Sequence, residues 1–187
     1  KEFPKLDVHK RVGDRGFGKS YKDGFKKILD DDRYQFVAMM DADLSHNPNE
    51  TPHMINLLDD YDMVVGSRYV RGGSIKIWKL YRRILSHFAN LYSRIILGLS
   101  IKDLTTGFMC FRKDILKKID LDSIKSEGYA FLVEFKYRAV KAGFKIIEHP
   151  ITFTERREGE SKMSYKIIWE SIWMPWKLRF FNKKSHR

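Results

Sequence analysis

Residues 36–48 read Phe36-Val37-Ala38-Met39-Met40-Asp41-Ala42-Asp43-Leu44-Ser45-His46-Asn47-Pro48. Five apolar residues are followed by two carboxylates one residue apart and then by a turn that contains proline. This order predicts a buried strand whose carboxyl end carries charge. In α/β proteins that end of a strand is where ligands bind. The stretch therefore predicts an α/β fold with its chemistry beside Asp41 and Asp43.

The two acids of this stretch are close enough to interact. On an extended backbone Asp41 and Asp43 share one side, because side chains alternate with a period of two. Two like charges at that distance favour a bound cation. Carboxylate oxygens suit Mg²⁺ or Mn²⁺, which take their other ligands from water and from a substrate's phosphates. The alternative is a solvated turn in which Asp43 caps a following helix, and so short a motif leaves both open.

The composition limits the classes of protein and partner. A chain of 187 residues with 43% hydrophobic and 14% aromatic residues fits one domain with a packed core, which excludes a disordered protein. The formal charge of +12 favours an anionic partner: nucleic acid, phosphorylated metabolites or a membrane surface. The single cysteine, Cys110, excludes an internal disulfide, so we expect a reducing, cytoplasmic setting. We also expect no transmembrane helix, because no uncharged apolar run approaches about 18 residues.

A glycine-rich stretch near the start carries a second phosphate-binding signal. Residues 13–20 read Gly13-Asp14-Arg15-Gly16-Phe17-Gly18-Lys19-Ser20 and match the P-loop pattern. In such enzymes a second strand ends in an acid that holds Mg²⁺, a part that Asp41 could play. The preceding residues are half charged, which suits an edge strand better than the central strand that a P-loop follows. The alternative is a glycine-rich loop that leads into an amphipathic helix.

A basic region follows the acidic pair. From Met63 to Lys102 the chain has no Asp or Glu but eight Lys or Arg, which indicates a bound polyanion. Within it, residues 79–97 predict a helix with a broad apolar face, made of Tyr81, Ile84, Leu85, Phe88, Leu91, Tyr92 and Ile95. Arg82, Ser86 and Asn90 recur every four residues on another face. An arginine and a hydroxyl one turn apart can bind one phosphate, although an ordinary polar face gives the same pattern.

The remaining segments leave three alternatives open. Glu134, on a helix predicted at about residues 128–142, is either a base or a structural partner of an arginine. Residues 156–162 are predicted to form a charged loop that could close on phosphates or remain solvated. Residues 165–187 combine aromatic and basic side chains, as segments at a membrane interface do, although these rings could also pack in a core. Pro175 is predicted to break any helix there.

Five motifs together resemble the dolichol-phosphate mannose synthases, polyprenyl-phosphate glycosyltransferases of glycosyltransferase family 2. They are Asp41–Pro48, Val65–Gly73, Arg82–Ser86, Asp103–Phe108 and Arg156–Ser164. The resemblance implies a GT-A, Rossmann-like α/β domain over residues 1–164, with a mixed, mainly parallel sheet flanked by helices. It implies an amphipathic, membrane-interfacial segment over residues 165–187. The family's first strands and its nucleobase pocket are expected to be missing from this chain.

The resemblance also implies an activity: metal-dependent, inverting transfer of mannose from GDP-mannose to a polyprenyl (dolichyl) phosphate. A glucosyltransferase that uses UDP-glucose is the alternative within the family. The expected enzyme works peripherally on the cytoplasmic face of a membrane and binds no nucleic acid. From other classes, a P-loop triphosphatase and a non-catalytic nucleic-acid-binding module remain alternatives.

The resemblance assigns roles to individual residues. Asp41, Asp43 and Ser45 are expected to bind the metal, Mg²⁺ or Mn²⁺. Ser45 stands where some relatives have glutamine. Arg68, Arg82 and Ser86 are expected to bind the acceptor phosphate. Arg156, Arg157 and Lys162 are expected to bind the donor diphosphate. Gly16 and Gly18 belong to a loop on the donor side, and the catalytic set is Asp41, Asp43 and Arg82. Glu134 is expected to be structural, because a phosphate acceptor has no proton that a base must remove.

Overall fold

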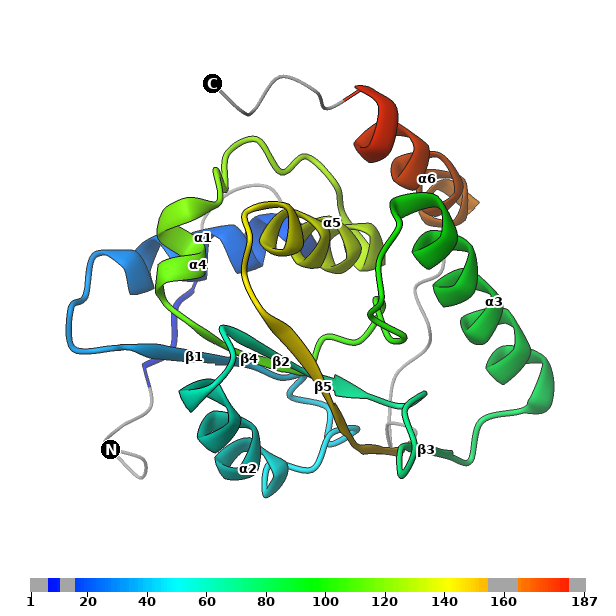
Figure 1. The fold of residues 1–187 in the computed structure, drawn as a ribbon, viewed down its shortest axis with the longest axis horizontal. Coiled ribbons are helices and arrows are strands. Elements are labelled where there is room, and N and C mark those ends of the chain that lie inside the picture. The colour runs from blue at the N-terminus through cyan, green and yellow to red at the C-terminus, as the bar shows by residue number, and fades with distance from the viewer. Residues whose placement is uncertain (1–6, 11–15, 155–164, 182–187) are drawn as a thin grey trace.

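The computed structural model describes residues 7–10, 16–154 and 165–181, arranged as a sheet with helices on both faces (Figure 1). The sheet has four strands in the order β1-β4-β2-β5: β1 Phe36–Met39, β4 Met109–Arg112, β2 Met63–Ser67 and β5 Ile146–Pro150. β4 is antiparallel to β1 and β2, whereas β2 and β5 are parallel. Three of the four strands therefore run in one direction, as the sequence predicted. Residues 7–10 form neither a helix nor a strand.

Helices cover the sheet from both sides (Figure 1). One face carries α1 Phe17–Leu29, α4 Asp114–Lys118 and α5 Gly128–Lys141, and the other carries α2 Glu50–Asn56 with a 3₁₀ turn, Leu57–Asp59. On the first face Phe111 of β4 packs between Phe25 and Phe135, with ring centroids 5.8 and 5.3 Å away. On the second face Met54 and Leu58 pack in a cluster that includes Phe108. The centre of the sheet is thus buried on both sides, and every residue of β2 is buried.

A smaller two-stranded sheet leads into the long helix of the basic region. β3 Ser74–Lys76 pairs in parallel with β6 Thr152–Thr154, and α3 Leu80–Leu97 follows β3. The predicted helix over residues 79–97 is confirmed. It ends at Gly98, which has a φ of +67° and donates its N–H to the Arg94 carbonyl at 2.9 Å. Glycine adopts this left-handed conformation without steric cost, so it terminates the helix.

The amphipathic pattern of α3 is inverted relative to an ordinary surface helix. Its polar Asn90 and Ser93 are buried against the protein. Most of its large apolar side chains are exposed instead, whereas Ile96 and Leu97 at its end are buried. The exposed ones include Tyr81, Ile84, Leu85, Phe88, Leu91 and Ile95. The apolar face predicted from the sequence therefore exists, and within the described residues most of it is exposed, while Tyr92 is half-buried and hydrogen-bonded to α6.

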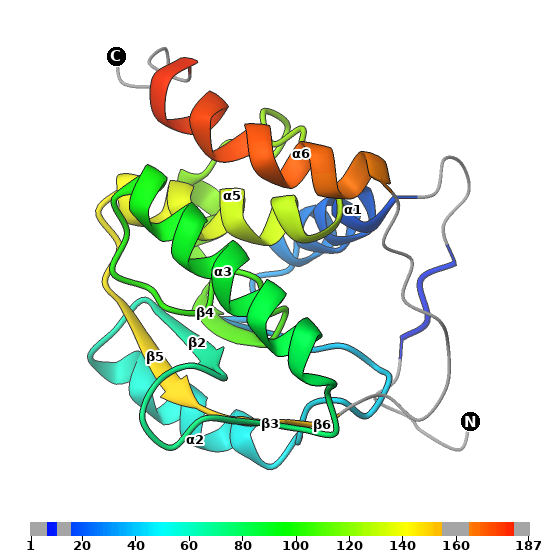
Figure 2. The same cartoon turned by 90° about the vertical axis from the view of Figure 1, so that its right-hand side faces the viewer.

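The last helix lies beside α3 (Figure 2). α6 Tyr165–Trp176 is followed by a π-helix, Lys177–Phe181. Pro175 does not end the helical segment, but the α-helix changes to the π-helix after Trp176, one residue beyond the proline. Met174 and Leu178 are buried, whereas the exposed large side chains are Trp169, Ile172, Trp173, Trp176 and Phe180. Core packing of those rings is thereby excluded within the described part of the chain.

No helix in the described ranges combines the length and the apolar character that crossing a bilayer requires.

Candidate active site

Asp41 and Asp43 lie just beyond the carboxyl end of β1, which stops at Met39. The expectation that both acids share one side of an extended strand is wrong, since residues 42–44 bend and Leu44 has a φ of +63°. Both acids are half-buried. Asp41 lies against Gly107, because a Cβ at that glycine would be only 3.3 Å from Asp41 Oδ1.

Ser45 fixes the second acid. Its Oγ donates a hydrogen bond to Asp43 Oδ1 at 2.5 Å, and its backbone N–H donates to the same oxygen at 3.1 Å. Ser45 is only 1% exposed whereas Asp43 is half-buried, so the pairing lies at the edge of the protein interior. The hydroxyl that the resemblance assigns to the metal is thus hydrogen-bonded to one of the two predicted metal-binding acids.

The pair of acids fits a hard divalent cation. Mg²⁺ and Mn²⁺ favour carboxylate oxygens and commonly use one or two from the protein, with substrate phosphates completing the coordination. Within residues 7–10, 16–154 and 165–181, no group of three or more His, Cys, Asp or Glu side chains could hold a metal. A cation at Asp41 and Asp43 would accordingly need further ligands, such as the phosphates of a nucleotide.

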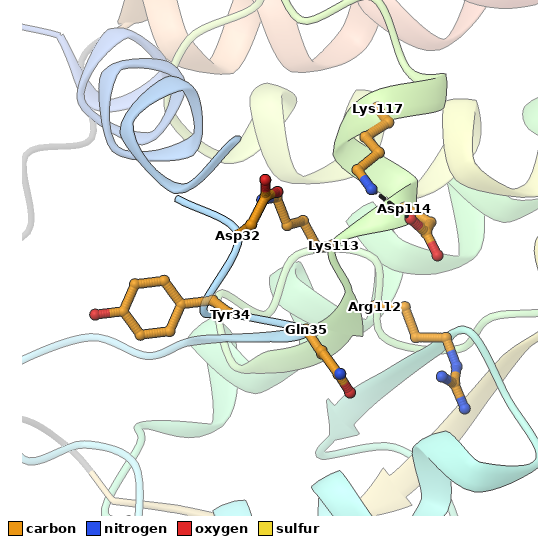
Figure 3. A pocket seen from close by; sticks show the side chains of 7 residues that line it. All are labelled: Asp32, Tyr34, Gln35, Arg112, Lys113, Asp114 and Lys117. Carbon is orange, nitrogen blue, oxygen red and sulfur yellow. Dashed lines mark hydrogen bonds and ion pairs between the residues drawn. The ribbon is translucent and has the colours of Figure 1, made fainter. Parts of the chain in front are cut away.

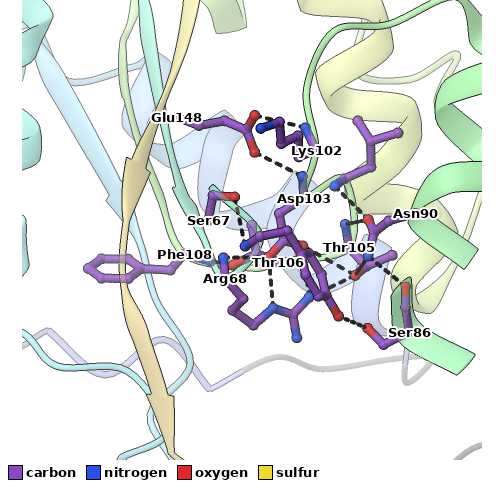
Figure 4. Close-up of polar contacts among 12 residues, drawn as sticks. Ser67, Arg68, Ser86, Asn90, Lys102, Asp103, Thr105, Thr106, Phe108 and Glu148 are labelled. Atoms are coloured by element: carbon purple, nitrogen blue, oxygen red, sulfur yellow. Dashed lines mark hydrogen bonds and ion pairs between the residues drawn. The ribbon is translucent and has the colours of Figure 1, made fainter. Parts of the chain in front are cut away.

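Arg68 follows β2 directly and forms a buried ion pair (Figure 4). Its Nε and Nη2 donate to Asp103 Oδ2 and Oδ1 at 2.7 and 2.8 Å, and Nη2 also donates to Thr105 Oγ1 at 2.9 Å. Burial acts to raise the pKa of Asp103, but the guanidinium outweighs it and holds that pKa below its usual value. The predicted phosphate-binding arginine is thus anchored by a carboxylate that the sequence interpretation had not paired with it.

The stretch from Asp103 to Gly107 is held from two helices. Asn90 Oδ1 on α3 accepts hydrogen bonds from the backbone N–H groups of Leu104 and Thr105, at 2.7 and 3.2 Å. Lys136 of α5 donates its Nζ to the carbonyls of Leu104 and Thr106, at 3.0 and 2.8 Å. Lys136 is fully buried, which lowers its pKa to about 7. This stretch touches both halves of the site, since Asp103 binds Arg68 and Gly107 lies against Asp41.

The predicted acceptor residues of α3 lie around two aromatic side chains. Ser86 Oγ accepts a hydrogen bond from Tyr69 Oη at 2.7 Å. The guanidinium of Arg82 lies 4.2 Å from the centroid of the Trp78 ring, and that of Arg68 lies 5.4 Å from the same centroid. The structure therefore brings Arg68, Arg82 and Ser86 together, as predicted. Tyr69 and Trp78 were missed, although both lie in the basic region that the sequence singled out.

His46 connects the acidic turn to this aromatic group. It is 4% exposed and lies between the rings of Phe108 and Phe153, with centroids 5.2 and 5.3 Å away. Burial, and then the nearby charge of Arg68, lowers its pKa to about 4, so the imidazole is neutral at physiological pH.

Of the glycine-rich stretch, Gly13, Asp14 and Arg15 lie outside the described residues, and the part from Gly16 onward leads directly into α1. α1 begins at Phe17, and the N–H of Gly18 donates to Glu127 Oε2 at 2.8 Å. A Cβ at Gly18 would lie 2.7 Å from the Ser126 carbonyl oxygen, so this glycine permits close packing of α1. The P-loop hypothesis is therefore not favoured, because the N–H of Gly18 binds a carboxylate of the chain itself. The expectation that Gly18 belongs to a loop is wrong, since Gly18 lies within α1. Gly16 lies against the same carboxylate, because a Cβ added at Gly16 would be 3.1 Å from both side-chain oxygens of Glu127.

Other predicted residues have separate outcomes. Glu134 pairs with Arg138 at 2.6 Å on α5, which confirms its structural role. Arg156, Arg157 and Lys162 lie outside the described residues.

Two pockets lie at different distances from the acids. One of about 200 Å³ lies at the start of β1, away from Asp41, and is lined by Asp32, Tyr34, Gln35, Arg112, Lys113, Asp114 and Lys117 (Figure 3). The other, of about 350 Å³, adjoins the acidic turn and is lined by Leu44, Ser45, His46, Asn47, Glu50, Lys76, Thr152 and Thr154. Only the second belongs to the candidate site.

Comparison with curated proteins finds similar mannosyltransferases. The chain is 42% identical over 171 residues to the undecaprenyl-phosphate mannosyltransferase of Micrococcus luteus, covering 91% of this chain and 70% of that protein. It is 41% identical over 169 residues to the polyprenol monophosphomannose synthase of Mycolicibacterium smegmatis, covering 90% of this chain and 63% of that protein. The predicted resemblance is therefore confirmed.

Comparison with solved structures supports the fold. Glucosyl-3-phosphoglycerate synthase from Mycobacterium tuberculosis, in complex with Mn²⁺, UDP-glucose and phosphoglyceric acid, matches with a TM-score of 0.58 at 14% identity. The match covers 92% of this chain and 57% of that one, and at this identity it bears on the fold alone. The predicted GT-A fold is confirmed. The family model described as glycosyl transferase family 2 matches residues 1–120, and the chain therefore belongs to this family of glycosyltransferase enzymes.

Proposed function

We propose that this protein transfers mannose from GDP-mannose to a polyprenyl phosphate, with inversion at the sugar and with the help of Mg²⁺ or Mn²⁺. The observation that carries the proposal is the stretch Asp103–Gly107, which contacts Asp41 at one end and binds Arg68 at the other. A candidate metal site and a group of cationic side chains are thereby held by one short loop. The names of the two curated relatives favour mannose and a polyprenyl phosphate.

On the donor side Asp41 and Asp43 would hold the cation against the diphosphate of the nucleotide sugar. The cation would supply charge neutralisation for the diphosphate that leaves. Ser45 keeps Asp43 in place through its hydrogen bond. We assign Arg156, Arg157 and Lys162 to the diphosphate as well, and Gly16 and Gly18 to the donor side of the fold, on the resemblance to the family.

On the acceptor side Arg82 and Ser86 would bind the lipid phosphate, and Arg68 would add positive charge from its fixed position beside Asp103. A phosphate monoester has a second pKa of about 6, so at neutral pH it is largely a dianion and a competent nucleophile. Its oxygen forms the bond to the anomeric carbon as the bond from that carbon to the donor diphosphate breaks. Because no proton has to be removed, the chain's task is to position the two reactants.

A membrane surface completes the proposal, because the acceptor is a lipid. The exposed apolar faces of α3 and α6 adjoin each other: Tyr92 Oη donates to the Ile172 carbonyl at 2.9 Å and accepts from Trp176 Nε1 at 2.8 Å. Exposed tryptophans beside basic residues are typical of helices that lie in a bilayer interface. We propose that α3 and α6 contact the cytoplasmic leaflet in this way, with residues 165–187 acting as a peripheral attachment.

Product analysis tests the proposed reaction. The protein is incubated with Mn²⁺, a polyprenyl phosphate and either labelled GDP-mannose or labelled UDP-glucose, and the lipids are then extracted. We expect label in the lipid phase only from GDP-mannose, in an acid-labile product whose sugar has the anomeric configuration opposite to that of the donor. Label from UDP-glucose alone would overturn the choice of donor, and retained configuration would overturn the single displacement.

Vesicle binding tests the proposed membrane contact. We expect Phe88→Ser, on the exposed face of α3, to weaken co-sedimentation with phosphatidylglycerol vesicles. Tyr34→Ser serves as the matched control, because Tyr34 is also an exposed aromatic residue but precedes β1, far from α3 in the fold. Equal binding of the two variants would contradict this contact.

A further inference from the structure

Trp78 lies in the connection between β3 and α3, where two cationic side chains meet one aromatic ring. The Arg82 guanidinium carbon is 4.2 Å from the indole centroid, and the Arg68 guanidinium carbon is 5.4 Å from it. A cation over an aromatic face is attracted by the partial negative charge on that face, and tryptophan gives the strongest attraction. The ring therefore contributes to holding both guanidinium groups in place.

The position of Arg82 is electrostatically unusual. It is in the first turn of α3, which contains no acidic residue. The amino end of a helix carries partial positive charge, so a cation there is unfavourable and an anion is favoured. The attraction of the Trp78 ring offsets part of this cost. An arginine kept at this place is suited to bind an anion that is also drawn to the helix end.

The backbone before Trp78 is strained. Ile77 has a φ of +72°, in the left-handed region that a β-branched residue rarely adopts. Ile77 is exposed while Trp78 is half-buried, so the strain accompanies the turn that places the indole against the protein. Strain of this kind persists only where the surrounding contacts impose it, and it is concentrated at functional sites.

The indole also contacts a row of rings. Phe153 of β6 meets Trp78 edge to face, with centroids 5.3 Å apart and an interplanar angle of 70°. The same phenylalanine meets His46 at 5.3 Å and lies 5.4 Å from the guanidinium of Arg68. His46 follows Ser45, which orients Asp43. Trp78, Phe153 and His46 thus connect the two arginines to the acidic turn.

We propose that Trp78 is a positioning residue for the acceptor: its ring holds Arg82 beside Arg68, which Asp103 already fixes, so that both guanidinium groups act on one phosphate monoester. The inference rests on the proposed function, because it concerns the acceptor phosphate of that reaction. It assigns Trp78 no contact with the sugar nucleotide. Loss of the ring should therefore weaken the acceptor and leave the nucleotide unaffected.

The test measures equilibrium binding of farnesyl phosphate, a short polyprenyl phosphate, and separately of GDP with Mn²⁺, by titration calorimetry in detergent. From the strength of cation–π contacts we expect Trp78→Leu to raise the Kd for farnesyl phosphate by about 3- to 30-fold. Trp78→Phe, which keeps an aromatic face, should recover most of the affinity. The Kd for GDP with Mn²⁺ should stay the same in both variants.

Tyr34→Leu provides the matched control, because it removes a ring from beside another guanidinium, that of Arg33 at 5.5 Å, outside the site. This variant should bind farnesyl phosphate as the wild type does. Unchanged binding by Trp78→Leu would overturn the inference alone, and so would equal losses for both ligands without recovery in Trp78→Phe. If Trp78→Leu fails to fold, Trp78→Met, which also removes the aromatic face, replaces it, and a wild-type Kd for farnesyl phosphate in Trp78→Met would overturn the inference. Failure of the wild type to bind farnesyl phosphate would instead overturn the proposed acceptor.

Discussion

Replacing Arg68 by methionine should destabilise the protein strongly. The side chains of Arg68 and Asp103 are 6% and 0% exposed, and the two are joined by hydrogen bonds of 2.7 and 2.8 Å. Arg68→Met would leave the Asp103 carboxylate buried without its guanidinium partner. Removing one member of a buried pair costs about 3–5 kcal/mol, because the remaining charge is left uncompensated. At roughly 2–4 °C per kcal/mol for a chain of this size, Tm should fall by about 6–20 °C.

Arg33→Met is the matched control for this measurement. Arg33 also forms two-pronged contacts with an aspartate, Asp31, but its side chain is 78% exposed. Exposed pairs contribute about 0–1 kcal/mol, so this substitution should scarcely change Tm. Both variants are followed by circular dichroism during heating and during urea unfolding. Equal, small losses in Arg68→Met and Arg33→Met would refute the inference that the buried pair organises the site.

The same pair sets a pH dependence. The folded-state pKa of Asp103 lies below its ordinary value of 3.8, so its stabilising effect is complete above that value. It is lost as the pH falls through the lower, folded-state pKa. The difference in unfolding free energy between wild type and Asp103→Asn should therefore be larger at pH 7 than in strong acid. A difference that stays constant with pH would contradict this ion pair.

Three further predictions concern separate parts of the structure. Gly18→Ala should lower the free energy of unfolding by about 1–3 kcal/mol, since its Cβ would lie 2.7 Å from the Ser126 carbonyl oxygen. Gly24→Ala in the same helix, where a Cβ would meet nothing within 4 Å, should raise it by about 0.5–1 kcal/mol. Urea unfolding measures both. Ser45→Ala should raise the Mn²⁺ concentration for half-maximal transfer at least about tenfold, because Asp43 loses its orienting hydrogen bond. Burial raises the pKa of Cys110 to about 12, so iodoacetamide at pH 8 should modify only the unfolded protein.

Each of these has a clear contrary result. A Gly18→Ala variant as stable as Gly24→Ala would show that α1 does not approach residue 126 as closely as described. An unchanged Mn²⁺ requirement in Ser45→Ala would remove the orienting role of the hydroxyl. Rapid alkylation of Cys110 in the native protein would contradict its burial in β4.

Local patterns predicted the elements that carry the site. The apolar run before Asp41 identified β1, and helical spacing identified α3 to within one residue. Both succeeded because periodicity and the placement of charge at a strand end are properties of neighbouring residues. The contacts of Arg82 and Ser86 with the same small region were also predictable, since the two are one helical turn apart.

Pairings between distant residues could not be predicted from these patterns. Arg68 and Asp103 are 35 positions apart, and nothing in the spacing of either shows that they meet. The apolar pattern of α3 indicated a face but not what covers it, so the exposure of that face came only from the structure. The P-loop match is not favoured for a related reason: the glycine pattern is local, whereas the carboxylate of Glu127 that binds Gly18 comes from 109 residues away.

The central claim is that Asp41 and Asp43 hold a divalent cation that transfer to a polyprenyl phosphate requires. The most direct test measures labelled mannose transferred to lipid by wild type and by Asp41→Asn, first with EDTA and then with Mn²⁺ restored. We expect EDTA to abolish transfer by the wild type, Mn²⁺ to restore it, and Asp41→Asn to stay inactive in both conditions while unfolding at the wild-type temperature. Transfer that persists in EDTA, or in a folded Asp41→Asn protein, would contradict the claim.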